Sequence, residues 1–268
     1  MGRKKYIRAR QSSIHSMIEV KYDGRVMVVL LNRPEKRNAI DFETANQLQD
    51  IFERFEKDES LYVAVISGLG GHFCSGADLT DLENLEKRAI DVNSPGPLGI
   101  TRRVLSKPVI AAIAGYCVAG GFELALWADI RIAEENAKFG FLERRFGVPL
   151  IDGGTQRLPL IAGLGNALYL ILTGKLIDAQ EAFRMGIVNE IVPVGKSLER
   201  AIELAKEISS YPQVTLRSDR LALYSTLNLE EKMKIEAEYG KKVIENRVFL
   251  KYVELFKAGK GRGGTKIF

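Results

Sequence analysis

A single carboxylate interrupts one of the most apolar stretches of the chain. The segment 115–129 reads GYCVAGGFELALWAD, and Glu123 lies in it among Phe, Leu, Ala and Trp. Acidic side chains are almost never fully buried unless a partner compensates the charge. Glutamate is also a common general acid or base, and burial can tune its pKa for that task. Glu123 is therefore a candidate catalytic residue; the alternative is a structural carboxylate that caps a helix or pairs with a cation.

Two glycine-rich turns offer backbone amides to a negatively charged oxygen. Gly120 and Gly121 follow an expected strand over 109–117 and precede an apolar helical pattern. The first amides of a helix have no intrahelical acceptor and carry partial positive charge, and glycine lets a ligand approach them. The segment 67–79, SGLGGHFCSGADL, has the same order of strand, glycines and small residues. One amide from each turn could hold a carbonyl oxygen as it becomes an enolate, although such turns can also serve packing alone.

Alternating strands and helices must position these turns. Short apolar runs predict buried strands at 26–31, 62–67, 109–114, 130–133 and 187–192. Between the first two runs, apolar residues recur at helical spacing from Phe42 to Phe55, and Asp41 or Asn38 can cap this helix. Such alternation indicates an α/β fold.

The pattern changes near residue 196, after which the segments are helical in period and contain no strand. We therefore expect three parts: a mobile basic extension over 1–17, an α/β core over 18–196, and a helical region over 197–268 that ends in a basic, glycine-rich tail. The extension lacks the apolar segment of a secretory signal. A transit peptide remains an alternative for it, and Met17 an alternative first residue.

Composition and missing motifs argue against several functions. The 268 residues include only two cysteines and two histidines, which fits a reducing, cytoplasmic location and offers no metal-binding spacing. Neither a dinucleotide fingerprint nor a phosphate-binding loop is present. Ser75 in FCSGAD does not follow the pattern of a hydrolase nucleophile. The segment 109–128 could imitate a membrane span, but it contains Glu123 and a glycine pair, so a buried strand, turn and helix explain it better.

Five segments resemble, in order and spacing, the enoyl-CoA hydratase/isomerase (crotonase) family. They are NRPEKRNAI (32–40), HFCSGADL (72–79), GYCVAGGFELALWADIRIA (115–133), KFGFLERRFGVPLIDGGTQRLP (138–159) and LTGKLIDAQEAFRMGIVNEIV (172–192). The resemblance extends from about Ile18 to the C-terminus. It implies a spiral of ββα turns with a C-terminal helical trimerisation region, and a homotrimer or a hexamer built from two trimers. It also implies acyl-CoA thioester substrates and no metal or redox cofactor.

The resemblance also implies roles for individual residues. The two amides that hold the thioester oxygen in the family map to Ala77 and Gly120, and the two glutamates of its hydratases map to Glu123 and Glu143. Glu143 would donate a proton while Glu123 holds the attacking water; an exposed ion pair is the alternative for Glu143. Residues expected to contact CoA or the acyl chain are Lys36, Arg37, Ala39, Ser75, Ala77, Asp78, Leu79, Gly120, Leu142, Asp152, Lys257 and Lys260.

Three positions depart from the usual hydratase pattern. Leu142 stands where many hydratases have proline, and Thr80-Asp81 replaces a frequent lysine. Asp152 stands where a small residue is usual, and it either caps the following helix or faces the acyl chain as in isomerases of the family. The sequence thus predicts an enoyl-CoA hydratase. The alternatives are an enoyl- or dienoyl-CoA isomerase that uses Glu143 and Asp152, and a non-catalytic binding protein. RNA is a poor ligand for the latter, because the basic residues that give the net charge of +5 are spread along the chain.

Overall fold

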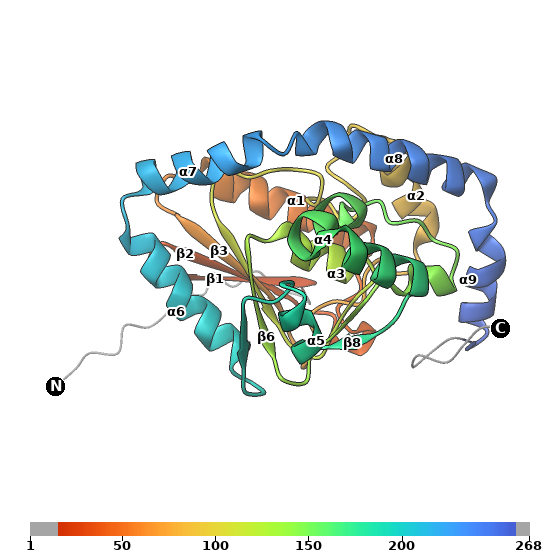
Figure 1. Cartoon of the computed structure of the whole chain (residues 1–268), viewed down its shortest axis with the longest axis horizontal. Helices are drawn as coiled ribbons and strands as arrows, with labels where there is room; N and C mark the ends of the chain where they lie inside the picture. Colours follow the sequence, from red (N-terminus) through yellow and green to blue (C-terminus); the bar gives the residue numbers. More distant parts are fainter. Residues whose placement is uncertain (1–15, 261–268) are drawn as a thin grey trace.

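Two β-sheets form the centre of the protein (Figure 1). A computed structural model describes residues 16–260, apart from the side chains of residues 82–85. The large sheet has the order β1-β2-β3-β4-β6-β9, in which only β1 and β2 are antiparallel, and the small sheet has the order β5-β7-β8. The described strands are β1 (Ile18–Asp23), β2 (Val26–Leu31), β3 (Val63–Gly68), β4 (Val109–Ile113), β5 (Tyr116–Val118), β6 (Ile130–Glu134), β7 (Lys138–Gly140), β8 (Ile177–Asp178) and β9 (Glu190–Val192).

In the middle of the chain, strands enter the two sheets in turn, and a helix follows each pair. β4 lies in the large sheet and β5 in the small one before α3 begins; β6, β7 and α4 repeat this order. The arrangement agrees with the expected spiral of ββα turns. The described helices are α1 (Phe42–Lys57), α2 (Leu82–Ile90), α3 (Gly120–Trp127), α4 (Gly154–Thr173), α5 (Ala179–Arg184), α6 (Ser197–Ser210), α7 (Gln213–Ser225), α8 (Leu229–Asn246) and α9 (Phe249–Lys257), with short 3-10 helices η1 (Pro34–Lys36) and η2 (Leu142–Arg145).

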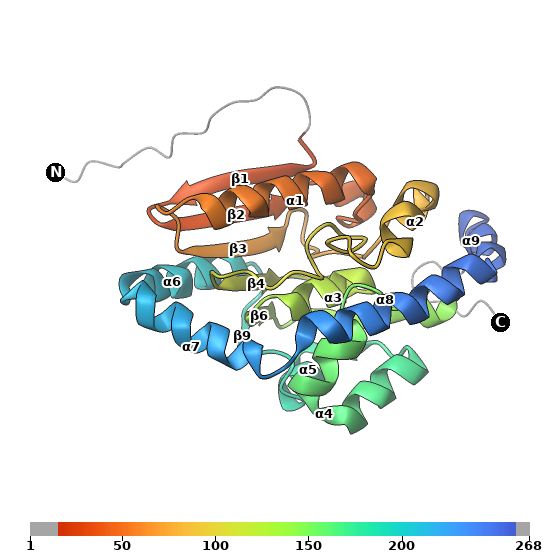
Figure 2. The same cartoon turned by 90° about the horizontal axis from the view of Figure 1, so that it is seen from above.

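Both faces of the large sheet are covered, as its apolar strands require. Successive side chains of a strand point to opposite faces. In β2, Met27 and Val29 belong to the main core with α1 and α3, whereas Val28 belongs to a second cluster with Ala201 and Ala205 of α6. Helix α6 therefore lies against the sheet, and α7, α8 and α9 run from it toward the other end of the molecule (Figure 2).

The predicted elements are confirmed in most places. The strand 26–31 is β2, and the helix after residue 41 is α1, whose first turn is capped by the side chain of Asp41 through a 2.8 Å hydrogen bond from Thr44 N. Asn38 does not cap this helix; its side chain donates to the carbonyls of Leu69 and His72. Strand β1 is absent from the prediction, because its residues IEVKYD alternate too weakly to suggest a buried strand.

The single strand predicted over 109–117 is wrong. β4 ends at Ile113, and the chain turns at Gly115, whose φ is +49°, to enter the small sheet as β5. The continuous apolar pattern hides the turn because both strands are buried. The strand predicted over 187–192 is likewise too long, since only Glu190–Val192 pairs with β6.

The C-terminal helical region passes from the large sheet to the far end of the molecule. Helix α8 lies beside α2, and α9 follows after a break at Arg247, whose φ is +58° (Figures 1 and 2). Within residues 16–260, no helix is long and apolar enough to cross a membrane. Most of the predicted mobile extension (1–17) and of the basic tail lies outside the described part of the chain, which omits residues 1–15 and 261–268. Met17, the last residue of the extension, is described, and its carbonyl accepts from Asn32 N at 2.8 Å.

Candidate active site

A cavity of about 610 Å³ brings the predicted site residues together. This volume lies within the range of small-molecule sites. All of the predicted residues line it except Lys257 and Lys260; those that do are Lys36, Arg37, Ala39, Ser75, Ala77, Asp78, Leu79, Gly120, Glu123, Leu142, Glu143 and Asp152. Apolar residues of the C-terminal helices also reach it, among them Ile244 of α8 and Phe249 and Phe256 of α9. No signal in the sequence placed these three beside the glutamates.

The backbone amides of Ala77 and Gly120 lie close together in the lining of this cavity. Ile40 donates to the carbonyl of Gly76 and accepts from Asp78 N, so the amide of Ala77 points away from Ile40. Gly120 lies so near that a Cβ on it would be 3.6 Å from Ala77 N. Within residues 16–260, neither Ala77 N nor Gly120 N donates a hydrogen bond. The pair is therefore available to a ligand oxygen.

The residue before Gly120 is held in a strained conformation. Ala119 has φ +54° and ψ −136°, a region that residues with a Cβ rarely adopt. Such strain costs about 1–3 kcal/mol and tends to occur at functional sites. Here it directs the first amide of α3 into the cavity. Gly76 permits the close approach, because its φ is +93° and a Cβ on it would lie 2.8 Å from Gly120 N.

Glu123 lies in the first turn of α3 and is only 2% exposed. Its Oε1 accepts hydrogen bonds from Asp152 N at 3.0 Å and from Gly154 N at 2.8 Å. Burial, and then the nearby carboxylates of Asp152, Glu236 and Glu143, raise the pKa of Glu123 well above its ordinary value. Glu123 therefore lines the cavity, and one of its oxygens binds an amide just before α4 and the first amide of α4. Its catalytic role stays a prediction.

Glu143 lies in η2 and is buried without a partner. It is 6% exposed, and neither carboxylate oxygen accepts a hydrogen bond from the described chain. The surface ion pair with Arg144 or Arg145 is not formed; Arg144 instead donates to the carbonyl of Val148. Burial raises the pKa of Glu143 to about 8. An orphaned buried acid is costly to a fold and is typical of a site that awaits a ligand.

Asp152 does not cap α4, so that alternative is wrong. The N-cap residue of α4 is Gly153, and the side chain of Asp152 turns instead toward the loop before β4, where its Oδ1 accepts from Leu98 N at 3.1 Å and from the hydroxyl of Thr101. Burial raises the pKa of Asp152 even though these hydrogen bonds oppose the shift. Within residues 16–260, no hydrogen bond engages Oδ2 of Asp152, and the residue lines the cavity.

Comparison with known proteins assigns this chain to a family. Residues 21–257 match the family model described as enoyl-CoA hydratase/isomerase. The chain belongs to the enoyl-CoA hydratase/isomerase family. It is 40% identical over 186 residues to a mevalonyl-coenzyme A hydratase of Aspergillus fumigatus, covering 69% of each chain. It is 37% identical over 206 residues to a short-chain-enoyl-CoA hydratase of Clostridium acetobutylicum, covering 75% of this chain and 78% of the relative.

Solved structures of the enoyl-CoA hydratase/isomerase family share the fold. The crystal structure of a carnitinyl-CoA hydratase from Mycobacterium avium superimposes with a TM-score of 0.82 at 29% identity, covering 92% of this chain and 97% of that one. This likeness confirms the predicted α/β crotonase-like fold with its C-terminal helical region. The relatives also support enoyl-CoA hydratase activity in general.

An ion-pair cluster occupies the polar mouth of the cavity in this family member. Oδ2 of Asp78 accepts from Lys36 Nζ at 2.7 Å and from Arg33 Nη2 at 2.9 Å. Burial alone would raise the pKa of Asp78, but hydrogen bonds from Lys36, Thr80 and Arg33 outweigh it and lower the pKa to about 2. Asp78 therefore fixes this loop. Arg33 is absent from the predicted set, although its place in NRPEKRNAI is a usable signal.

The remaining predicted cations differ in their positions. The guanidinium of Arg37 lies 4.9 Å from the ring centroid of Tyr116, and both residues line the cavity. Lys257 instead pairs with Glu254 of its own helix at 3.2 Å, and neither Lys257 nor Lys260 lines the cavity. Their predicted contact with CoA is not tested by the structure of one chain and stays a prediction.

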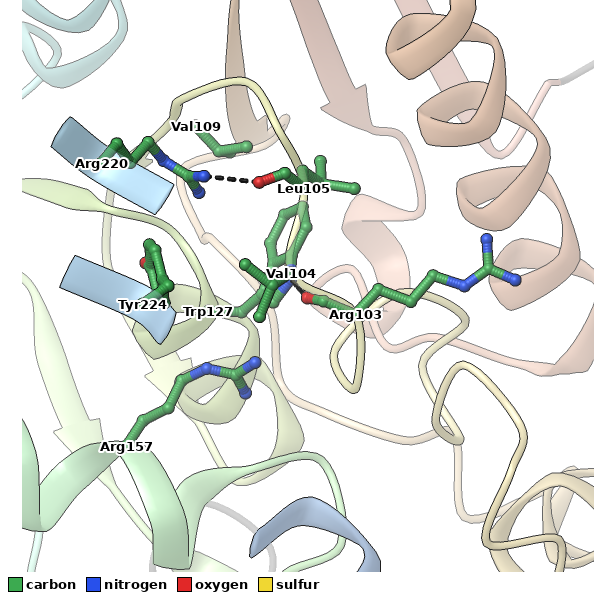
Figure 3. A pocket seen from close by; sticks show the side chains of 8 residues that line it. All are labelled: Arg103, Val104, Leu105, Val109, Trp127, Arg157, Arg220 and Tyr224. Atoms are coloured by element: carbon green, nitrogen blue, oxygen red, sulfur yellow. Dashed lines mark hydrogen bonds between the residues drawn. The ribbon is translucent and has the colours of Figure 1, made fainter. Parts of the chain in front are cut away.

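A second pocket lies apart from the candidate active site (Figure 3). It is bounded by Trp127, Arg157, Arg220 and Tyr224, and Arg220 closes it by donating to the carbonyl of Leu105. Its volume of about 10 Å³ is that of a single water molecule. The pocket is too small for any acyl chain, so the large cavity is the candidate site.

Glu143→Gln should stabilise the protein increasingly as the pH rises. In the unfolded chain the carboxyl of Glu143 has its ordinary pKa of about 4.5, whereas burial in the folded chain raises this pKa to about 8. Because the folded state binds the extra proton in this window, the contribution of Glu143 to stability falls as the pH rises through it. Glutamine has no such penalty. We expect the gain in the free energy of unfolding to be about 1 kcal/mol at about pH 5 and about 4 kcal/mol at about pH 8, measured by urea unfolding. A constant difference at every pH would contradict the shifted pKa.

Proposed function

We propose that this protein is an enoyl-CoA hydratase that adds water across the 2,3 double bond of a 2-enoyl-CoA thioester. The observation that carries the proposal is the orphaned carboxylate of Glu143, which shares one cavity with Glu123 and with the free amides of Ala77 and Gly120. The names of the Clostridium acetobutylicum relative and of similar proteins support the same reaction. The reaction requires no metal or redox cofactor.

The free amides would act on the thioester carbonyl. With its oxygen at Ala77 N and Gly120 N, the carbonyl withdraws electrons from the 2,3 double bond, so that water can attack C3. The negative charge that develops on the oxygen of the enolate is then stabilised by two fixed donors. Loss of one such donor typically costs about 3–4 kcal/mol of transition-state stabilisation.

The two glutamates would orient the water and transfer the protons of the reaction. Glu123 orients the water and accepts a hydrogen bond from it, while Glu143 supplies the proton that C2 takes up. The oxygen of the water forms the new bond at C3 and keeps one hydrogen as the product hydroxyl. The other proton of the water passes to Glu123, so the glutamate pair ends with as many protons as at the start. The active form of the pair therefore carries one proton in total.

The polar mouth would bind the CoA part of the substrate. Lys36 and Arg37 lie at this end of the cavity, and cations there would attract the phosphates of CoA. Ala39, Ser75 and Leu79 would contribute the neighbouring surface, and Leu142 would contact the acyl end. The homotrimer or hexamer expected for the family stays a prediction.

Hydration of crotonyl-CoA tests this proposal. Purified protein should remove the ultraviolet absorbance of the conjugated enoyl thioester, and the product should be 3-hydroxybutyryl-CoA by mass spectrometry. Loss of the absorbance without the hydroxylated product would contradict hydration. If CoA thioesters neither react nor bind in calorimetry, the enzyme interpretation fails. Binding without reaction would favour a non-catalytic binding protein.

Double-bond isomerisation is the second candidate function, and Asp152 is the observation that favours it. Its carboxylate lines the cavity and is free at Oδ2, so that Glu143 and Asp152 could move one proton between two carbons of an acyl chain. The hydratase proposal predicts that 3-enoyl-CoA reacts more slowly than crotonyl-CoA, and that Asp152→Asn leaves crotonyl-CoA hydration within about fivefold of the wild type. Rapid conversion of 3-enoyl-CoA that is lost in Asp152→Asn would favour the isomerase.

The pH profile should reflect the single proton of the glutamate pair. Glu143 titrates at about 8 because burial disfavours its charge, and Glu123 is also raised. An acid form that is needed for catalysis is present below its pKa and lost above it. We therefore expect kcat/KM for crotonyl-CoA to fall above about pH 8, with the limb belonging to the coupled pair. A rate that keeps rising to about pH 10 would exclude a carboxylic acid as the proton donor.

A further inference from the structure

The turn that begins α4 is held between two buried carboxylates from different helices. Four successive amides alternate between them. Asp152 N and Gly154 N donate to Glu123 of α3, at 3.0 and 2.8 Å. Gly153 N and Thr155 N donate to Glu236 of α8, at 2.6 and 2.9 Å. The turn is thus held by carboxylates on both sides, and one of them, Glu123, is a proposed catalytic residue.

Glu236 uses both of its oxygens on this turn. Oε1 accepts from Gly153 N, and Oε2 accepts from Thr155 N and from the hydroxyl of Thr155. The side chain is 4% exposed, and a carboxylate at that depth is costly unless hydrogen bonds compensate it. Arg157 of α4 contributes a favourable charge to Glu236, while the nearby carboxylate of Glu123 is unfavourable. Within residues 16–260, every hydrogen bond to the side chain of Glu236 comes from this turn.

The shape of α8 fits the turn closely. Met233, Glu236 and Gly240 lie on one face of α8, at helical spacing. A Cβ on Gly153 would lie 2.7 Å from Cε of Met233, and a Cβ on Gly240 would lie 1.9 Å from Cγ2 of Ile151. Only a glycine at position 240 allows this approach. Helix α8 therefore packs closely against residues 151–155, and Glu236 accepts hydrogen bonds from this turn.

We propose that Glu236 is a positioning residue for Glu123. Movement of the turn would move Asp152 N and Gly154 N, and the carboxylate that they hold would move with them. A displacement of about 1 Å in a catalytic group can lower a rate by about 100-fold. Glu236 holds the turn in place from α8, so the C-terminal helical region helps to determine the position of Glu123. This inference rests on the proposed function, since it assigns the task of Glu236 within that reaction.

Three variants separate positioning from stability. Glu236→Ala removes both acceptors. Glu236→Gln keeps a carbonyl oxygen for Gly153 N and an amide that can donate to the hydroxyl of Thr155, and it removes only the acceptor for Thr155 N. Met233→Ala is the matched control, because it removes packing from the same face of α8 but no hydrogen bond to the turn. Each is assayed with crotonyl-CoA below its unfolding temperature, and hydrogen–deuterium exchange is followed in peptides covering residues 150–158.

We expect Glu236→Ala to lower kcat by about 10- to 100-fold with KM changed less than about threefold. Glu236→Gln should remain within about fivefold of the wild type, and Met233→Ala should lose stability but keep kcat within about twofold. Exchange at residues 150–158 should be faster in Glu236→Ala than in Met233→Ala. A kcat for Glu236→Ala within twofold of the wild type would overturn the proposal, as would an equal loss in the alanine and glutamine variants.

The failure of the proposed function would look different. If the wild type hydrates no enoyl-CoA, that function is wrong, but exchange still decides whether Glu236 holds the turn. Protection that is the same in the wild type and in Glu236→Ala would then overturn the positioning role by itself.

Discussion

Glu143→Gln should lower kcat for crotonyl-CoA hydration by about 10²–10⁴-fold, with a much smaller change in KM. The carboxyl is buried, touches no other polar group of the described chain and faces the cavity, so its proton has no structural partner to lose. Glutamine has nearly the same shape but cannot transfer that proton to C2. Binding of the thioester should therefore survive, and initial rates over a range of crotonyl-CoA concentrations measure both constants.

A matched control is available in a second buried glutamate. Glu134 is 5% exposed and accepts from the hydroxyl of Ser197 at 2.9 Å, and it does not line the cavity. Glu134→Gln should keep kcat within about threefold of the wild type. Because Glu143→Gln is also expected to be more stable than the wild type, a loss of activity in it cannot be attributed to misfolding. Hydration by Glu143→Gln at more than about a tenth of the wild-type rate would remove Glu143 from the mechanism.

Two substitutions of Glu123 should separate its catalytic and structural roles. Glu123→Gln retains an oxygen for Asp152 N and Gly154 N, so stability should change little while kcat falls by about 10²–10³-fold. Glu123→Ala leaves two buried amides without an acceptor, and we expect it to lose about 2–4 kcal/mol of stability in addition. Urea unfolding and crotonyl-CoA kinetics on both variants measure the two effects.

The comparison between the two substitutions is the decisive part. If Glu123→Gln and Glu123→Ala unfold at the same urea concentration, the hydrogen bonds from Asp152 N and Gly154 N to Glu123 contribute nothing to stability. If Glu123→Gln remains fully active, Glu123 is structural alone, and the water must be held by another group. Asp152 would then be the next residue to test.

Much of the candidate site could be predicted from the sequence because its parts are local. The turn at Gly120, the glutamate three residues later and the turn near Ala77 are each recognisable in one short segment. The resemblance to a family then joined these segments. The cap at Asp41 and the strand at β2 follow equally from local periodicity and capping preference.

The rest depends on contacts between distant segments. Glu236 meets the turn at Gly153 from 83 positions away, and nothing in the helical pattern of α8 distinguishes it from its exposed neighbours. Asp152 precedes a helix and so fits a cap, but Glu123 and Glu236 already occupy the amides there, and the loop at Leu98 takes its carboxylate instead. Ala119 shows no composition signal for a positive φ, because that conformation is imposed by the surrounding structure.

The most direct test of the central claim is the fate of solvent oxygen. Crotonyl-CoA is incubated with the protein in water enriched in ¹⁸O, and the molecular mass of the product is measured by mass spectrometry. The account predicts a 3-hydroxyacyl-CoA that carries one ¹⁸O atom, formed by the wild type and by Glu134→Gln but not by the double variant Glu123→Gln/Glu143→Gln. Labelled product from the double variant at the wild-type rate, or an isomerised enoyl-CoA without the label from the wild type, would contradict it.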